Sequence, residues 1–135
     1  MAFIDWKYSF SVNIEKIDLQ HKELIECINQ LFDAMKEGRG KNILGDIVSS
    51  LIHYTESHFK TEEVYFEQYG YPATESHKSE HAAFVKKVTD FKSDLDSGKA
   101  ILSNDVLQFL KNWLQNHIIG SDKLYSKFLN EKGLR

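Results

Sequence analysis

The chain has 135 residues, a formal net charge of −3, one proline and one cysteine. This length suggests one domain with a single substantial core. Acidic and basic residues are interspersed, and no basic block is longer than Lys86-Lys87, which gives nucleic-acid binding little support. No stretch approaches the roughly 20 apolar residues that cross a membrane, so no membrane association is expected.

Two features lead us to expect a cytoplasmic protein. Residues 1–10 lack the charged start and apolar run of a secretory signal. The single cysteine, Cys27, excludes an intramolecular disulfide. Because Cys27 lies near the flank of the first predicted helix, we interpret it as a small, partly buried hydrophobic residue and not as a reactive thiol.

Residues 1–16 carry aromatic and apolar residues without a helical period, so we expect an arm laid against the domain surface. Asp18 is the predicted cap of the helix that follows, at about 18–37. In this helix apolar residues, together with His21, recur in alternating steps of four and three, which is the pattern of an amphipathic bundle helix. The stretch Gly38-Arg39-Gly40 ends it, because glycine permits the left-handed turn of many helix stops.

Three further helices are predicted at about 43–69, 74–97 and 104–130. Gly70-Tyr71-Pro72 separates the second from the third, because proline is tolerated only near a helix start. Ser103 or Asn104 is the predicted cap of the fourth. Short connections between four long helices make neighbours antiparallel. The chain is therefore predicted to be a single all-α domain over 1–135, an up-down-up-down antiparallel four-helix bundle with an N-terminal arm.

Five of the six histidines and two carboxylates fall on the apolar stripes of these helices. Isolated polar groups are costly to bury, and coordination to a metal ion supplies the missing partner. Seven ligands would crowd one metal ion, so the count suits two ions better. The seven candidate ligands are His21, His58, Glu62, His77, His81, His117 and Asp122.

The spacing of these residues determines which of them can reach one site. His58 with Glu62, and His77 with His81, are four apart and point the same way on a helix. A step of five, from His117 to Asp122, turns roughly 140° away on a regular helix. We therefore predict a π-type bulge or a break over residues 118–121, eased by Gly120 in this segment.

A structural role is the alternative for each residue alone, because a single histidine on an apolar stripe is usually a hydrogen-bonded core histidine. A lone pair of histidines four apart is weak evidence for the same reason. Seven coherent positions on four helices make the metal site the better interpretation. The sixth histidine, His53, lies off the stripe, and we interpret it as a non-ligand.

With these residues in place the chain resembles the hemerythrin family, specifically its single-domain bacterial branch. The resemblance spans nearly the whole chain and includes all seven candidate ligands. The motifs that carry it are Asp18-Leu19-Gln20-His21, His58-Phe59-Lys60-Thr61-Glu62-Glu63, Gly70-Tyr71-Pro72 followed by His77 and His81, and Trp113-Leu114-Gln115-Asn116-His117-Ile118 followed by Asp122.

The resemblance implies a non-haem centre of two iron ions with an oxo or hydroxo bridge, also bridged by Glu62 and Asp122. One iron would be saturated by three histidines (His77, His81 and His117). The other would be held by His21 and His58 and keep one open position, at which dioxygen binds and leaves unchanged. Imidazole and carboxylate ligands suit iron, and unequal histidine counts create one open site.

Reversible binding requires a dry pocket, since water and protons promote loss of reduced oxygen. Candidate lining residues lie within a turn of the ligands, and ordinary core packing is expected of them as well. They are Leu24, Ile25, Ile28, Phe59, Trp113, Leu114 and Ile118. Tyr54 and Tyr125 are candidate hydrogen-bond donors that orient ligands, with plain packing as the favoured alternative.

The expected function is oxygen binding for carriage, storage or supply, and not catalysis. A di-iron enzyme or scavenger acting on peroxide or nitric oxide is the alternative, since the open iron could also react with small oxidants. A ferroxidase is disfavoured because no histidine follows a glutamate by three residues. Zinc fits poorly, since it rarely takes so many ligands. A sensor would have to act in trans, because the chain ends at Arg135 without a signalling domain. A monomer is compatible with the sequence, while the oligomeric state and any protein partner stay open.

Overall fold

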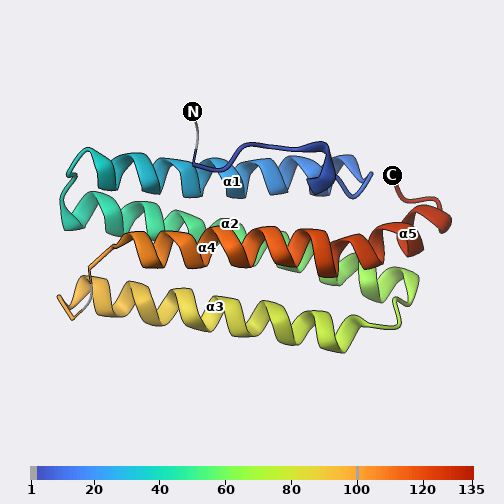
Figure 1. Cartoon of the computed structure of the whole chain (residues 1–135). Helices are drawn as coiled ribbons and strands as arrows, with labels where there is room; N and C mark the ends of the chain where they lie inside the picture. The colour runs from blue at the N-terminus through green and yellow to red at the C-terminus, as the bar shows by residue number, and fades with distance from the viewer. Residues whose placement is uncertain (1–2, 100) are drawn as a thin grey trace.

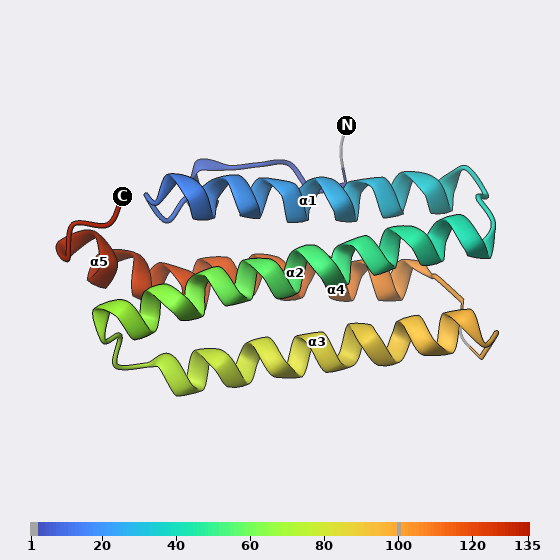
Figure 2. The ribbon, with the colours of Figure 1, turned by 180° about the vertical axis from the view of Figure 1, so that it is seen from behind.

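The computed structural model describes residues 3–99 and 101–135. Four helical columns lie side by side and alternate in direction along the chain, as both ribbon views show (Figure 1, Figure 2). The predicted all-α four-helix bundle is therefore confirmed. Its elements are a 3-10 turn η1 (Tyr8–Phe10) and helices α1 (Glu15–Lys36), α2 (Lys41–Tyr69), α3 (Thr74–Asp96), α4 (Asn104–Asn116), η2 (His117–Asp122) and α5 (Lys123–Glu131).

The fourth column is not one regular helix. It consists of α4, a π-helical segment η2 and α5, which follow each other without a loop (Figure 1). The predicted distortion between His117 and Asp122 is thus present and takes the π form. Gly120 has no positive φ, and a Cβ added there would meet no other atom within 4 Å. The distortion therefore does not depend on glycine's conformational freedom.

The arm before α1 packs against the bundle along α1 (Figure 1), while residues 1 and 2 lie outside the described residues. Its side chains Ile4, Phe10 and Val12 are buried. The backbone of Ile4 donates to Asn29 Oδ1 at 2.8 Å and accepts from Asn29 Nδ2 at 2.9 Å. On the other side Ser126 Oγ donates to the Val12 carbonyl at 2.7 Å. The arm therefore links α1 to α5.

Asp18 does not cap the first helix, contrary to the sequence prediction. The helix begins at Glu15, which places Asp18 inside its first turn. The carboxylate instead accepts from the Val12 amide at 2.8 Å and from the Ser11 hydroxyl at 2.5 Å. It thus satisfies the backbone of the incoming arm. The other predicted cap is present, because the Ser103 side chain accepts from the Val106 amide.

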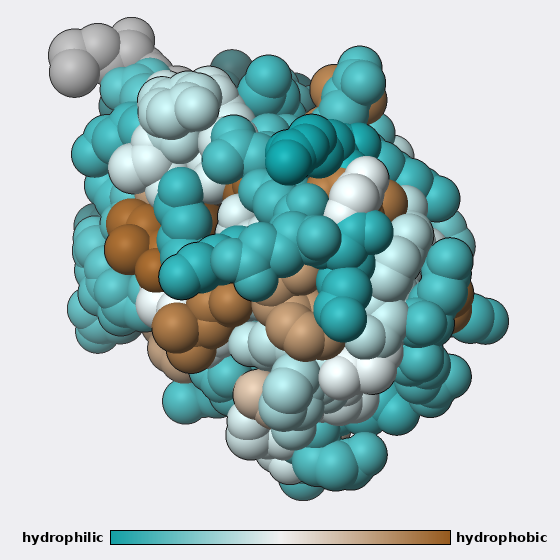
Figure 3. All heavy atoms as spheres, turned by 90° about the vertical axis from the view of Figure 1, so that its right-hand side faces the viewer, coloured by the Kyte–Doolittle hydropathy of each residue, from teal (hydrophilic) through white to brown (hydrophobic). Residues whose placement is uncertain are grey.

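Two apolar clusters fill the bundle. The larger one joins all four columns and includes Leu24, Ile28, Phe59 and Leu114. The smaller one lies where α5 and the turn between α2 and α3 meet, and contains Phe66 and Leu129. The surface over this end is mostly hydrophilic with scattered hydrophobic patches (Figure 3). No helix among the described residues is long and apolar enough to cross a membrane.

Cys27 is buried, as its position on the helix flank indicated. Its thiol lies 3.7 Å from the Ile47 carbonyl oxygen. Burial, and to a lesser degree the nearby Glu26, raises the pKa of this thiol to about 11. Because the thiolate is the reactive form, Cys27 is an inert core residue.

Replacing Asn29 by alanine removes both buried hydrogen bonds to Ile4 and leaves a backbone amide and carbonyl without partners. The expected loss is about 2 kcal/mol of unfolding free energy, measured by urea denaturation. Asn112→Ala serves as the control, because Asn112 is exposed and bonds only to Gln108 on the surface. An equal loss in both variants would show that Asn29 does not anchor the arm.

Candidate metal centre

The structure brings all seven candidate ligands to one place in the middle of the bundle. They form two groups, each with its ligand atoms within 4.8 Å of one another, and both groups contain Glu62 and Asp122. The first group adds His77, His81 and His117, and the second adds His21 and His58. His53 is exposed and belongs to neither group. The two carboxylates are therefore shared by a three-histidine side and a two-histidine side.

The π-helix explains how His117 and Asp122 both reach the centre. Hydrogen bonding from residue i to i+5 adds one residue to the turn, so residues five apart come to nearly the same face. The histidine is 4 % exposed and the aspartate 0 %. In a regular helix one of these two side chains would point out of the bundle.

Asp122 stands between the two sides. Its Oδ1 lies 3.0 Å from His77 Nε2 and 3.1 Å from His117 Nε2. Its Oδ2 lies 3.0 Å from His21 Nε2. One oxygen thus faces the three-histidine side and the other faces the two-histidine side.

Glu62 also serves both sides, through a single oxygen. Its Oε1 lies 3.3 Å from His58 Nε2 and 3.2 Å from His81 Nε2. Its other oxygen, Oε2, accepts a hydrogen bond from the hydroxyl of Tyr125. Oε1, by contrast, has no hydrogen-bond partner.

The atoms at this centre lack the partners that buried polar atoms normally have. Among the described residues, nine buried side-chain nitrogen and oxygen atoms have no hydrogen-bond partner, and all belong to the candidate ligands. They come from every member except His58. Such atoms are rare in a folded interior because each unpaired one is costly. The donor set of five imidazoles and two carboxylates fits divalent transition-metal ions such as iron, which would supply the missing partners.

Two of the five imidazoles, those of His58 and His81, are held in the neutral form that binds metal ions. Burial, followed by the neighbouring His21, keeps the pKa of His58 well below its usual value. Burial lowers the pKa of His81 to about 4, although the hydrogen bond to Glu63 opposes this shift. Both rings are therefore neutral at pH 7, as coordination through a ring nitrogen requires. The pKa of His117 is instead raised, because burial acts to lower it but the neighbouring carboxylates, Asp122 first, together outweigh burial.

The two carboxylates respond in opposite ways to being buried together. Burial, followed by the charge of Asp122, raises the pKa of Glu62 to about 8. Burial also acts to raise the pKa of Asp122, but the neighbouring histidines, His117 first and then His21 and His77, outweigh it and hold this pKa well below its usual value. Without metal one of the two anions is therefore protonated at neutral pH. Cations between them would remove the repulsion that causes this.

Three polar residues outside the ligand set contact the outer ring nitrogens, and the sequence analysis assigned them no role. Gln20 Oε1 lies 2.7 Å from His58 Nδ1, and Glu63 Oε2 lies 2.9 Å from His81 Nδ1. Glu80 Oε1 is 3.6 Å from His117 Nδ1. Gln20 and Glu63 directly adjoin ligands in the sequence, which was the available signal, whereas Glu80 required the helix arrangement.

The family follows from comparison with known proteins. The model of the hemerythrin HHE cation binding domain matches residues 12–129. The chain belongs to the hemerythrin family. Bacteriohemerythrin of Stenotrophomonas maltophilia is 34% identical over 126 residues, covering 93% of this chain and 81% of that protein. Bacteriohemerythrin of Methylococcus capsulatus is 34% identical over 131 residues, covering 96% and 99%. A solved structure of wild-type hemerythrin has a TM-score of 0.89 at 33% identity, covering 93% of this chain and 97% of that one.

This hemerythrin has a small apolar cavity beside its ligands. About 10 Å³ is open to the centre of a water-sized molecule, which is close to the minimum for one water. The ring of Phe59 stacks on His81 with 3.6 Å between centroids, and Trp113 stacks on His117 at 4.4 Å. These two lining residues place the cavity against ligands of the three-histidine side, while Leu24 and Thr55 in the same lining lie three residues from His21 and His58. The complete lining is Leu24, Ile28, Leu51, Thr55, Phe59, Phe84, Trp113 and Leu114.

Five of the seven predicted pocket residues line this cavity, and two do not. Ile25 and Ile118 are buried elsewhere in the core. Leu51, Thr55 and Phe84 also line the cavity but were not predicted from the sequence. Leu51 and Thr55 precede His58 by seven and three residues on the same helical stripe, so the periodicity contained the signal.

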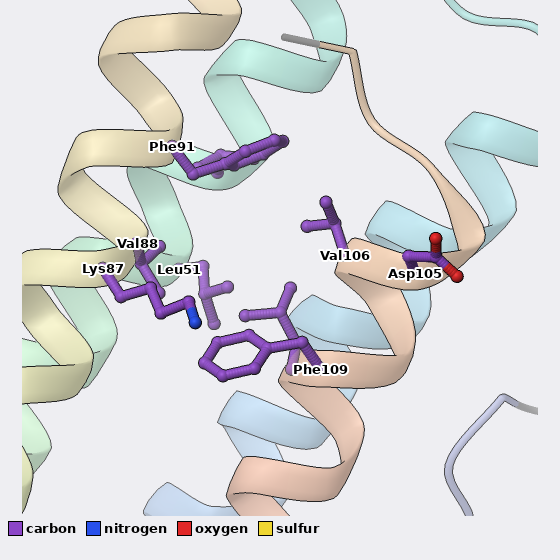
Figure 4. Close-up of a pocket in the computed structure, with 9 residues that line it drawn as sticks. Leu51, Lys87, Val88, Phe91, Asp105, Val106 and Phe109 are labelled. Atoms are coloured by element: carbon purple, nitrogen blue, oxygen red, sulfur yellow. The ribbon is translucent and has the colours of Figure 1, made fainter.

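A wider apolar pocket lies nearby between α2, α3 and α4 (Figure 4). It has a volume of about 230 Å³, and Leu51 lines both this pocket and the small cavity. The ammonium of Lys87 lies 4.4 Å from the ring centroid of Phe109 at its edge. None of the seven candidate ligands lines it.

Of the two tyrosines predicted to orient ligands, the structure places only one at the centre. Tyr125 is 0 % exposed and donates to Glu62. Tyr54 is 44 % exposed, and its ring lies beside that of His53. The prediction for Tyr54 was wrong, because its side chain leaves the bundle at the edge of the buried stripe of α2.

Replacing Tyr125 by phenylalanine keeps the ring but removes the donor to the buried Glu62. In the metal-free chain this change should cost about 1–3 kcal/mol of unfolding free energy, because the buried Oε2 of Glu62 loses its hydrogen-bond donor. Tyr54→Phe makes the same chemical change at the surface and should stay within about 0.5 kcal/mol of the parent. Urea denaturation measures both. Equal effects would contradict the assigned role of Tyr125.

Proposed function

We propose that this hemerythrin binds dioxygen reversibly at a centre of two iron ions, as a carrier, store or supplier of oxygen and not as an enzyme. The observation that carries the proposal is the unequal division of the histidines between two ligand groups that share both carboxylates. Three imidazoles on one side and two on the other give two like ions different numbers of protein ligands. The two-histidine side is left with a position for an outside ligand.

The proposed residue roles follow the two groups. His77, His81 and His117 would hold one iron, and His21 and His58 the other. Glu62 and Asp122 would bridge the pair, together with an oxo or hydroxo group. When bound, the iron pair supplies the electrons with which dioxygen is held.

The protein's own contribution is a dry cavity whose lining carries no acid or base. Seven of the eight residues that line the small cavity are hydrocarbon or aromatic, and Thr55 is the exception. Its hydroxyl donates to the Leu51 carbonyl at 2.6 Å, so its proton is already engaged. The absence of a free acid or base in this lining favours binding and release of dioxygen over its conversion.

Anaerobic reconstitution with ferrous iron tests the proposal. We expect two irons per chain, a visible absorption band that appears when oxygen is admitted, and loss of that band when oxygen is purged. The same cycle on His117→Ala should fail, because one iron loses a ligand. Immediate irreversible oxidation, or a stoichiometry below two irons, would overturn the proposal.

Leu114 tests the role of the cavity wall. Replacing it by alanine enlarges a space that holds about one water-sized molecule, so water should enter and spontaneous oxidation of the oxygen-bound protein should accelerate. The decay of the visible band in air measures this rate. Leu124→Ala, a change of the same size at a side chain 69 % exposed, is the control. An unchanged rate in the Leu114 variant would remove this residue from the proposed pocket.

A further inference from the structure

The outer ring nitrogens on the three-histidine side face carboxylates. The inner nitrogen of His81 points to Glu62, so its Nδ1 carries the proton and donates to Glu63 Oε2 at 2.9 Å. His117 Nδ1 lies 3.6 Å from Glu80 Oε1 and makes no hydrogen bond, so Glu80 acts on this ring through its charge alone. Two of the three imidazoles on this side therefore have an anion behind them.

Among the described residues, no carboxylate faces the outer ring nitrogens of the two-histidine side. His58 Nδ1 donates to the neutral amide oxygen of Gln20 at 2.7 Å. The amide nitrogen of Gln20 donates to the Thr61 hydroxyl at 3.2 Å, which fixes the orientation of the amide. The Nδ1 of His21 is buried without any hydrogen-bond partner. The only ion pair of His21 among the described residues is the one to Asp122.

This difference changes how strongly the rings bind a metal ion. A carboxylate that accepts the outer N–H proton makes the imidazole a more basic ligand, and removing such a partner typically weakens metal binding by about 10- to 100-fold. An amide oxygen fixes the tautomer without adding charge. A buried N–H without an acceptor gives neither benefit.

We propose that the two metal positions differ in intrinsic affinity, so that the three-histidine side fills first and the two-histidine side second. Glu63 and Glu80 are the positioning residues that strengthen the first side, while the neutral Gln20 keeps the second side weaker. The inference rests on the proposed two-metal centre and adds an order of loading to it.

Glu63 should contribute more than Glu80. Its oxygen is within hydrogen-bond distance of the ring, and its side chain is 30% exposed. The side chain of Glu80 is 46% exposed and its oxygen is farther from the ring. Both oxygens of Glu80 accept from the Ser121 hydroxyl, at 2.8 and 2.9 Å. Because Ser121 lies in η2, the π-helix orders this carboxylate as well as Asp122.

Zinc titration of the metal-free chain tests the order of filling, with the ring nitrogens followed by ¹⁵N NMR. Zinc is redox-silent and binds imidazole, so neither oxygen nor turnover enters the measurement. With one equivalent, the Nε2 signals of His77, His81 and His117 should shift. The signals of His21 and His58 should shift only with the second equivalent. Parallel shifts of all five rings, or prior shifts of the last two, would overturn the proposal.

Three single substitutions test the cause. Glu63→Gln keeps the side-chain shape but removes the charge, and should weaken the first binding step about tenfold. Glu80→Gln should weaken the same step by less. Gln20→Glu should tighten the second step, a gain that a purely structural role for Gln20 would not produce.

Glu67→Gln is the matched control, because it removes one negative charge from an exposed residue of α2 that pairs only with Lys78. Both of its binding steps should stay unchanged. If Glu63→Gln behaves like this control, or Gln20→Glu fails to tighten the second step, the proposed cause is wrong.

The result is separable from the test of function. A chain that loads two metal ions in the stated order, yet does not release oxygen when purged, would refute reversible oxygen binding alone. A chain that binds oxygen reversibly but fills both positions in parallel would refute the order of loading alone.

Discussion

The structure depends on burying two carboxylates, Glu62 and Asp122, where no water reaches them. Both are 0 % exposed and face each other's charge across the centre of the bundle. Such a pair is strongly unfavourable in a low-dielectric interior unless cations or hydrogen-bond donors surround it. Tyr125 supplies one donor, and the five imidazoles converge on the remaining oxygens. The unpaired atoms that remain are those that two metal ions would bind.

The same constraint explains the irregularity of the fourth column. A continuous α-helix would satisfy its backbone fully, but it would direct either His117 or Asp122 away from the centre. The π-helical segment gives up regular geometry over one turn to keep both inside. Gly120 is not needed for its backbone angles, so the requirement comes from the buried ligands at either end of the segment. The irregular backbone of this segment is therefore a local energetic cost of the ligand site, and it is confined to the turn between the two ligands.

The bundle and the ligand spacing were predictable from the sequence because helical periodicity records which face is buried. The periodicity of one helix does not show which residues of other helices it will contact. The interactions of Glu80 with His117 and of Tyr125 with Glu62 therefore appear only when the helices pack. Tyr54 shows that a spacing of four residues from a ligand does not by itself place a side chain on the buried face of the helix. It precedes His58 by one turn, but the stripe of buried residues in α2 is centred towards Thr55 and Glu62, on the other side of His58. A further step of about 40° away from that centre takes the tyrosine to the surface.

The unequal number of histidines on the two sides follows from the distribution of the ligands among the helices. Helix α3 is the one element that contributes two histidines, and their spacing of four directs both to the same side. Helix α1 contributes a single histidine, and α2 and η2 each contribute one histidine and one carboxylate. Two carboxylates that reach across the centre cannot restore the balance, because they serve both sides alike. In the proposed function, the position for an outside ligand is therefore a consequence of the helix assignments and needs no separate device.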